Sequence, residues 1–491
     1  MRESGILLPI SALPQGYGIG GFSGKAYEFV DWLAKAGQKN WQILPLGPTG
    51  YGDSPYQSFS TFAGNPYYID LDTLKEEGLL TEEECREADC GENPRSVDYG
   101  RIYETRFKVL RKAFSRFQED EGYRRFGEEN AFWLEDYCLY MAVKGSQAQN
   151  SWLKWPEALK KRHPEALEQA AAELEEEIRF YRFQQYCFDR QWKKLKQYAN
   201  DRGIRVIGDI PIYVALDSAD AWANPELFQF SEEGEPLAVA GCPPDAFAAT
   251  GQLWGNPLYR WSYHEETEYA WWMKRIQYCF RLYDVVRIDH FRGFESYYSI
   301  PYGDRTAEFG HWEPGPGIRF FQTLKQKLGN LPIIAEDLGF LTENVHRLLR
   351  DSGYPGMKVL EFAFDSREDS DYLPHNYHHN CVVYTGTHDN DTLAGWYQAM
   401  SRSDREFSVR YMNNARSLPE EIPWDFIRMA HSSVADLAVV PMQDYLGLGT
   451  EARFNEPSTL GKNWKWRMLP EECTDELAEK IRNMTKLYGR L

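Results

Sequence analysis

Residues 284–294 read DVVRIDHFRGF, a short apolar run that changes abruptly into charged residues. Arg287, Asp289 and His290 crowd around the end of this run. A solvated loop after a strand could carry such residues, and for one isolated run that is the ordinary interpretation. The interpretation changes if other strands of the chain end in the same way, because strand ends that meet at one rim build a site.

Eight short apolar runs occur along the chain, and most are continuously apolar, which is typical of parallel strands buried on both faces. Amphipathic helical patterns lie between them, for example at 23–37 and at 163–203, where Gly203 is a good helix stop. The runs therefore predict an α/β protein with a (β/α)8 barrel, and an open, doubly wound sheet is the alternative. The eight runs are GILLPI (5–10), NWQILPLG (40–47), RVIGDIPIYV (205–214), DVVRIDHF (284–291), PIIAEDLG (332–339), MKVLEFAF (357–364), CVVYTGTHD (381–389) and LAVVPMQDY (437–445).

A chain of 491 residues suits one barrel with insertions, or two or three ordinary domains. The spacing of the runs favours a single barrel over 1–491. The long gap between the second and third runs predicts a mostly helical insertion at 57–170. A second insertion at 215–265, after the third strand, is rich in Pro, Gly and aromatic residues and is expected to form a lid. No C-terminal β-sandwich domain is expected after the eighth run.

The bulk composition excludes several classes of partner. A net charge of −19 argues against nucleic acid, which requires clustered Lys and Arg. The N-terminal apolar stretch is too short for a signal sequence, and no run approaches the length of a membrane span. Eight scattered cysteines without a CxxC pair indicate reduced thiols and a cytoplasmic protein. The sequence predicts no oligomeric state.

Several of the other strands also end in charged residues. In a barrel these ends share one rim, so four strands bring carboxylates together there. Any one acid could simply cap the next helix, which is the ordinary explanation for Asp337 or Asp391 taken alone. Helix caps do not require arginine or histidine beside them, so capping does not explain the whole set of charged residues at the strand ends. The residues at the strand ends are Asp209, Arg287, Asp289, His290, Glu336, Asp337, His388 and Asp389.

Such a cluster suits either a divalent metal centre or glycoside cleavage by two carboxyl groups. Arg287 precedes Asp289 by two residues, so both point to one face of the strand, where Arg287 would hold Asp289 ionised. Glu336 would be the acid, with its pKa raised by neighbouring carboxylates in a partly dry cleft. The chain has no HxH or HExxH ligand pair. Glycoside cleavage is therefore favoured, without metal or other cofactor.

Four motifs carry a family resemblance: GDIPIYV (208–214), RIDHFRG (287–293), IIAEDLG (333–339) and TGTHDND (385–391). They resemble the conserved regions of the α-amylase clan, and their exact residues are most similar to those of the 4-α-glucanotransferases (amylomaltases or disproportionating enzymes) of glycoside hydrolase family 77. Three longer stretches extend the resemblance over nearly the whole chain. These are LPLGPTGYGDSPYQSFSTFAGNPY (44–67), TGQLWGNPLYRW (250–261) and FNEPSTLGKNWKWR (454–467).

The resemblance implies roles for particular residues. Asp289 is expected to be the nucleophile, Glu336 the general acid/base, and Asp389 the third carboxylate, which binds sugar hydroxyls and steadies the transition state. The other residues expected to bind substrate include three near the carboxylates, two tyrosines on the N-terminal side, three lid residues and one aspartate after the sixth run. They are Arg287, His388, Asp209, Tyr56, Tyr51, Phe247, Gln252, Trp254 and Asp365. The alternative for the lid residues is ordinary loop packing.

The activity implied by the resemblance is transfer of a segment of an α-1,4-glucan to the 4-hydroxyl of another glucan or of glucose, by double displacement with retention. The expected partners are α-1,4-glucans and malto-oligosaccharides. The many Tyr and Trp residues suit stacking on sugar rings. The alternatives are an α-glucan hydrolase and a non-catalytic glucan-binding protein, and the intact carboxylates disfavour the second of these.

Overall fold

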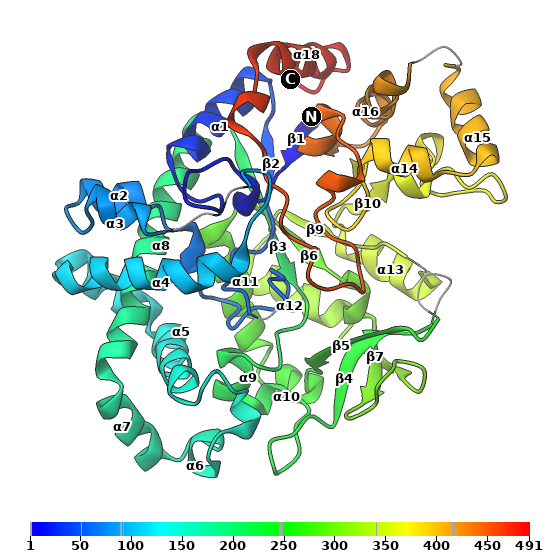
Figure 1. Ribbon diagram of the computed structural model, residues 1–491. Coiled ribbons are helices and arrows are strands. Elements are labelled where there is room, and N and C mark those ends of the chain that lie inside the picture. The colour runs from blue at the N-terminus through cyan, green and yellow to red at the C-terminus, as the bar shows by residue number, and fades with distance from the viewer. Residues whose placement is uncertain are drawn as a thin grey trace.

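A sheet of eight parallel strands forms the centre of the molecule in the computed structural model (Figure 1), which describes residues 2–50, 52–88, 91, 93–244, 249–339, 341–414 and 418–491. The strand order is β10-β11-β12-β1-β2-β3-β6-β9. Each strand overlaps one of the eight apolar runs, so the prediction of an eight-stranded barrel is confirmed. The strands are β1 (Glu3–Leu7), β2 (Asn40–Gln42), β3 (Arg205–Pro211), β6 (Val285–Asp289), β9 (Ile333–Ala335), β10 (Gly356–Val359), β11 (Cys381–Tyr384) and β12 (Leu437–Pro441).

The barrel closes between β9 and β10. The backbone N–H of Ala335 donates to the carbonyl of Pro355 at 2.9 Å, and the N–H of Met357 donates to Oδ1 of Asp337 at 2.6 Å. A side-chain carboxylate therefore replaces one backbone acceptor at this seam. Asp337 does not cap the following helix, α13 (Glu343–Ser352), whose N-cap residue is Thr342.

Helices cover the outside of the barrel (Figure 1). Helix α1 is amphipathic and buries Phe29, Trp32 and Leu33 while exposing its polar face, which is the pattern that predicted it. The connection from β10 to β11, all of it described, contains 3-10 turns at Leu360–Phe362 and Pro374–Asn376 but no α-helix. The helices that follow β1 and those that come after β6 are α1 (Gly24–Lys35), α12 (Ile318–Leu328), α13, α14 (Leu393–Ala399), α15 (Arg402–Met412), α16 (Ile422–Ser432), α17 (Met442–Leu446) and α18 (Asp475–Leu487).

The chain between β2 and β3 folds into helices that lie beside the barrel, coloured from blue through cyan to blue-green in Figure 1. The segment 163–203, read from the sequence as one helix, is two helices that meet at Leu174. The second ends just before Gly203, whose φ of +71° lies in the left-handed region that favours glycine. The helices are α2 (Leu71–Glu76), α3 (Glu82–Arg86), α4 (Tyr99–Arg116), α5 (Glu121–Ser146), α6 (Glu157–Lys160), α7 (Pro164–Glu173) and α8 (Glu175–Asp201).

A four-stranded antiparallel sheet, which was not predicted from the sequence, lies at the lower edge of the barrel in Figure 1. Its order is β5-β4-β7-β8, so it joins two strands that follow β3 to two strands that follow β6. The expected lid at 215–265 thus contributes half of a sheet. The elements of this region are α9 (Ala219–Ala223), β4 (Ala238–Cys242), β5 (Gln252–Pro257), α10 (Trp261–Glu266), α11 (Ala270–Leu282), β7 (Ser296–Pro301) and β8 (His311–Pro314).

The two ends of the chain lie together at the top of Figure 1. Arg490 is buried, and its Nη1 donates to the carbonyl of Glu3 at 2.9 Å. Strand β1 and helix α18 are therefore fastened to each other. None of the helices in the described part of the chain is long and apolar enough to cross a membrane.

The substitution Gly356→Ala tests the closure of the barrel. A Cβ at this position would lie 2.5 Å from Oδ2 of Asp337, so the carboxylate must shift away from the N–H of Met357. Leaving a buried donor unsatisfied costs about 1–3 kcal/mol, and the midpoint of urea unfolding should fall accordingly. Gly145→Ala in α5 is the control, because its added Cβ has no neighbour within 4 Å apart from the adjacent residues and the backbone of its own helix. An unchanged midpoint for Gly356→Ala would refute this account of the seam.

Candidate active site

The register between β3 and β6 places Asp209 opposite Arg287 and Pro211 opposite Asp289. Nη1 of Arg287 donates to Oδ2 of Asp209 at 2.6 Å and lies 3.0 Å from Oδ1 of Asp289. The side chains of Arg287 and Asp209 are almost fully buried. Burial by itself lowers the pKa of the guanidinium, but Asp209 and Asp289 more than offset it, and the pKa lies well above its ordinary value. One buried cation therefore joins the acids of two neighbouring strands.

Asp289 is more exposed than Asp209 and Arg287, and 30% of its side chain is accessible to solvent. The pKa of its carboxyl is raised to about 7, and burial is the largest cause. The carboxylates of Asp209 and Glu336 add to the rise, whereas Arg287 opposes it. Arg287 thus favours the ionised form of Asp289, as expected, but the net shift of the pKa is upward rather than downward. Burial and two nearby acids outweigh the single guanidinium, which Asp289 shares with Asp209.

Glu336 comes directly after β9, the next strand along the barrel wall. Its Oε2 accepts from the backbone N–H of His290 at 2.7 Å, and its Oε1 accepts from the N–H of Leu338 at 2.8 Å. Burial raises the pKa of Glu336, although Arg287 and the two N–H donors oppose the shift, while Asp337 adds to it. Both oxygens of this carboxyl are thus fixed by backbone, and the group is inclined to keep its proton.

His290 shows why a histidine follows Asp289. Its backbone is left-handed, with φ +56° and ψ 50°, and this turn directs its N–H at Glu336. Its ring meets the ring of Trp254 edge-on, with centroids 4.9 Å apart. Burial lowers the pKa of the imidazole to about 3, so the ring is neutral. His290 contributes a backbone donor and an aromatic surface to the site rather than a charge.

His388 and Asp389 follow β11 on the opposite side of the rim, and His388 Nε2 lies 3.3 Å from Oδ2 of Asp389. Burial by itself lowers the pKa of His388, but Asp389 reverses the shift and raises it. For Asp389 the effect of burial has the opposite sign and raises the pKa. The interactions with His388 and Asn455 outweigh burial, and the pKa of Asp389 falls to about 2. Asp389 is thus the one carboxyl of the three that is ionised at every ordinary pH.

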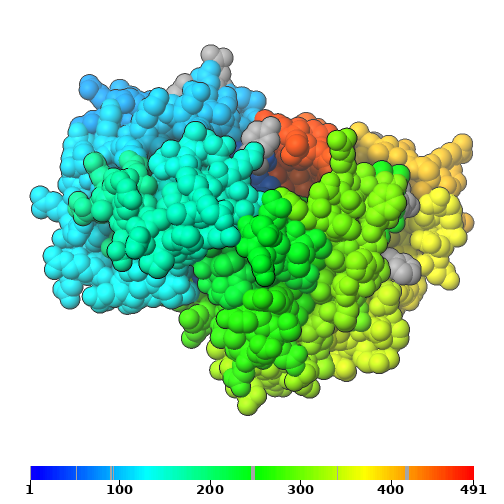
Figure 2. Space-filling view, turned by 90° about the horizontal axis from the view of Figure 1, so that it is seen from below, coloured from blue at the N-terminus to red at the C-terminus, as the bar shows by residue number. Residues whose placement is uncertain are grey.

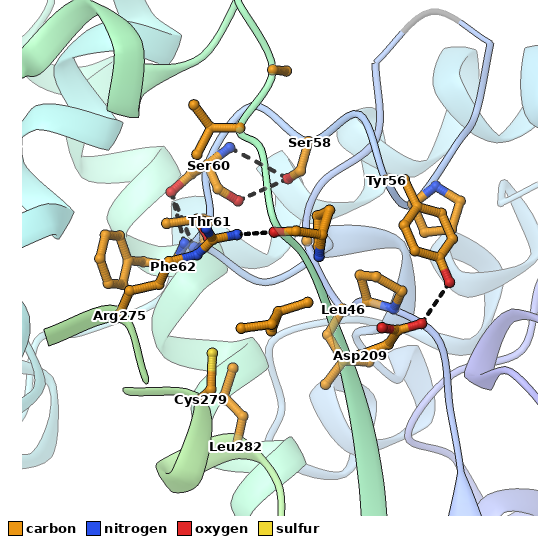
Figure 3. A pocket seen from close by; sticks show the side chains of 18 of the residues that line it. Leu46, Tyr56, Ser58, Ser60, Thr61, Phe62, Asp209, Arg275, Cys279 and Leu282 are labelled. Carbon is orange, nitrogen blue, oxygen red and sulfur yellow. Dashed lines mark hydrogen bonds between the residues drawn. The ribbon is translucent and has the colours of Figure 1, made fainter. Parts of the chain in front are cut away.

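Tyr56 connects the two sides of the rim. Its hydroxyl donates to Oδ2 of Asp209 at 2.6 Å, as the dashed line in Figure 3 shows. Its ring stacks on the ring of His388, with centroids 5.0 Å apart and an angle of 18° between the planes. Arg287, Asp209, Tyr56, His388 and Asp389 therefore form a continuous chain of contacts around the rim.

Two residues of the C-terminal segment that hold Asp389 were not predicted from the sequence. Asn455 Nδ2 donates to Oδ1 of Asp389 at 2.6 Å, and Arg453 Nη2 donates to its backbone carbonyl at 2.6 Å. Arg453 also binds the carbonyl of Asn455, which makes the three residues one unit. Asn455 is the second residue of the stretch 454–467, which carries part of the family resemblance, and this polar residue was the signal that could have identified it.

The remaining residues expected at the site divide into three groups. Gln252 and Trp254 lie on β5, where Trp254 Nε1 donates to Gln252 Oε1 at 3.1 Å, and the contact with His290 brings Trp254 to the site. Tyr51 and Phe247 lie outside the described residues. Asp365 follows the turn after β10, and its carboxylate is engaged by both the backbone and the guanidinium of Arg367. These contacts do not connect Asp365 to the rim cluster.

The surface is hollowed at this rim. Figure 2 shows a depression between the teal and green segments and the orange C-terminal segment, with blue residues of the N-terminal part at its floor. Behind Tyr56 and Asp209 lies a separate, small cavity of about 40 Å³ (Figure 3). Within the described ranges, no three His, Cys, Asp or Glu side chains are grouped so as to hold a metal ion.

A barrel whose rim gathers three carboxyls with shifted pKa values, two raised and one lowered, beside a buried arginine and half-exposed aromatic rings, has the features of an enzyme site. Residues 8–472 match the family model described as 4-alpha-glucanotransferase. The chain is 51% identical to a 4-alpha-glucanotransferase of Clostridium butyricum, over 98% of this chain and 99% of that one, and 47% identical to one of Thermus thermophilus, over 100% and 99%.

The structure superimposes on an amylomaltase from Streptococcus agalactiae in complex with acarbose, with a TM-score of 0.97, 42% identity and full coverage of both chains. The chain belongs to the 4-alpha-glucanotransferase family. Its activity is that of a 4-alpha-glucanotransferase, and the resemblance drawn from the four motifs is confirmed.

Removing Arg287 should destabilise the fold through Asp209. The substitution Arg287→Met leaves a carboxylate buried without its cation, which costs about 3–5 kcal/mol for a buried ion pair. The double variant Arg287→Met with Asp209→Asn removes the stranded charge and should recover part of that loss. Urea unfolding measures both. A double variant that is less stable than Arg287→Met alone would show that the charge of Asp209 is not the cause.

Proposed function

We propose that Asp289, Glu336 and Asp389 perform the transfer by double displacement. Asp289 attacks the anomeric carbon of the donor glucan while Glu336 protonates the departing glycosidic oxygen, which leaves a β-glucosyl ester on Asp289. Glu336, now a carboxylate, removes the proton from the 4-hydroxyl of an acceptor sugar. That oxygen attacks the anomeric carbon, the bond from this carbon to Asp289 breaks, an α-1,4 bond forms, and the carboxylate of Asp289 is released.

The observation that carries this proposal is the link between Asp289 and Glu336. They end neighbouring strands, and the residue after Asp289 donates its N–H to Glu336. Glu336 has a raised pKa and two fixed oxygens, which suits a group that must hold and then return a proton. Arg287 beside Asp289 stabilises the carboxylate that leaves the ester in the second step.

Asp389 suits the role of a permanent charge near the donor sugar. Its pKa of about 2 keeps it ionised, and its side chain is 46% exposed although it is held by His388 and Asn455. An ionised carboxylate accepts hydrogen bonds from sugar hydroxyls and stabilises positive charge on the ring in the transition state. We assign His388, Asp209 and Tyr56 to the binding of the same sugar, with Trp254 and Gln252 contributing from the lid.

We propose α-1,4-glucans and malto-oligosaccharides as donors and acceptors. The amylomaltase from Streptococcus agalactiae was solved with acarbose, an oligosaccharide-like ligand, and it shares the fold over its full length. Half-exposed Trp254 offers an aromatic face for a sugar ring beside the carboxyls. Transfer exceeds hydrolysis when a bound sugar hydroxyl reaches the ester better than water does, and an aromatic lid favours that outcome.

We also propose a cytoplasmic location. Cys85, Cys138, Cys187, Cys279 and Cys381 are buried thiols, which suits a reducing compartment. The net charge of −19 makes nucleic acid an unsuitable partner.

The substitution Asp289→Asn tests the nucleophile. It keeps the size of the side chain but cannot form the ester, so disproportionation of maltotriose should fall by several orders of magnitude. Binding of glucans should persist, because the aromatic contacts are unchanged. Chromatography of maltotriose incubated with each enzyme measures transfer, since redistribution to longer sugars and glucose separates it from hydrolysis. A variant with wild-type turnover would exclude Asp289 as nucleophile, and shorter sugars alone from the wild type would indicate a hydrolase.

The pH dependence of kcat/KM tests the charge balance around Asp289. The negative charge of Asp209 helps to raise the pKa of Asp289, so Asp209→Asn should lower that pKa below about 7. Because Asp289 must be ionised to attack, the acidic limb of kcat/KM for maltotriose should move to lower pH in the variant. Asp31→Asn, on the far helix α1, is the control and should leave the limb in place. A limb that moves to higher pH would contradict the assigned electrostatics.

A further inference from the structure

A second cavity, of about 260 Å³, lies away from the rim cluster. Three parts of the chain enclose it: α5 of the helical insertion, the segment around α9, and the helices α10 and α11. Pockets for small ligands usually have volumes of roughly 300–1,000 Å³, so this one fits a small ligand or a short piece of a longer one. No step of the transfer reaction described above uses it.

Aromatic side chains form the apolar part of this cavity. Phe132 of α5 is 44% exposed, and Tyr263 and Trp271 are half-buried on the facing helices. Phe62 lies beneath them, with its ring edge-on to Phe132 and to Trp271. Rings gathered around a hollow and left open to solvent are typical of surfaces that bind the apolar face of a flat ligand.

The polar groups of the cavity disfavour an anionic ligand. Asp136, Asp220 and Glu226 line it, against the single lysine Lys274. Asp136 is partly neutralised by Arg162, whereas Asp220 is buried, with Oδ2 accepting from the N–H of Thr61 at 2.7 Å. Carboxylates and the amide of Asn224 accept hydrogen bonds from hydroxyls. Aromatic faces with acceptors at their edge match a neutral polyhydroxyl ring, which is a sugar.

The two cavities share part of one loop. Ser60 and Phe62 line both, and Tyr56, four residues before Ser60, binds Asp209 at the rim (Figure 3). The loop is fastened on the side of the second cavity, because the N–H of Ala219 donates to the carbonyl of Phe59 at 2.8 Å. A ligand in the second cavity would therefore lie against the same loop that carries Tyr56.

We propose that this cavity is a non-catalytic binding site for a short segment of an α-glucan chain, which holds long substrates at the enzyme. The proposal rests on the proposed function, because it takes the donor and acceptor to be glucans. Phe132 and Tyr263 supply the faces on which the sugar rings stack, and Asp136, Asn224 and Glu226 accept their hydroxyls. Maltotriose is too short to need this site, whereas glycogen can occupy it and the rim at once or with separate branches.

Affinity electrophoresis in gels that contain glycogen tests the site. Phe132→Ala and Tyr263→Ala should each weaken glycogen binding by roughly two- to tenfold, the range expected for one aromatic contact. Phe132→Tyr keeps an aromatic face and should bind like the wild type. Leu487→Ala, which removes an exposed apolar residue on α18, away from the cavity, is the control. The kcat and KM for maltotriose should be unchanged in all four variants, and thermal melting confirms that each is folded.

The outcomes separate this inference from the proposed function. Wild-type retention of Phe132→Ala and Tyr263→Ala in glycogen gels would overturn the second site, even where maltotriose is disproportionated normally. A loss of maltotriose turnover in these folded variants would also overturn it, because the cavity would then belong to the catalytic site. A wild-type enzyme that does not redistribute maltotriose would instead refute the proposed function, whatever the gels show.

Discussion

The buried guanidinium of Arg287 is the interaction on which the site depends. Burying a cation costs several kcal/mol unless acids and hydrogen bonds surround it, so its neighbours are constrained to one arrangement. Asp209 comes from β3, Asp289 from the same strand as Arg287, and Met357 of β10 places its sulfur 3.4 Å from Nε. Met357 is also the residue whose N–H binds Asp337 at the seam. Closing the barrel and fixing the arginine are therefore parts of one network.

Around this cation, nearly identical side chains acquire different properties. Asp289, with a pKa of about 7, and Asp389, with a pKa of about 2, differ because one shares its cation with Asp209 while the other has His388 and Asn455 to itself. His290 and His388 differ in the same way, since His290 has no carboxylate that offsets its burial and His388 has Asp389. One rim thus holds a fixed charge and two proton-binding carboxyls, the division that acid–base chemistry requires.

Local patterns in the sequence predicted the features that depend on the spacing of apolar residues and on the residues at the ends of strands. The eight apolar runs became eight strands, and the two-residue spacing placed Arg287 beside Asp289. Contacts between distant segments left no such signal: the antiparallel sheet pairs residues near 240 with residues near 300, and Asn455 reaches back to Asp389. The sign of the shift at Asp289 was also missed, because burial depends on the whole barrel rather than on the neighbours in sequence.

His290 shows how the chain accommodates an unfavourable backbone at this rim. A left-handed conformation costs a residue other than glycine about 1–2 kcal/mol, yet glycine at this position would lack the ring. The cost of the left-handed backbone is offset by the hydrogen bond from the N–H of His290 to Glu336 and by the packing of its ring on Trp254 of β5. Because the imidazole is neutral, it can fill an apolar space beside the carboxyls without adding a charge that would lower their pKa values. The same residue thereby fixes the acid by its backbone and supports the lid by its side chain.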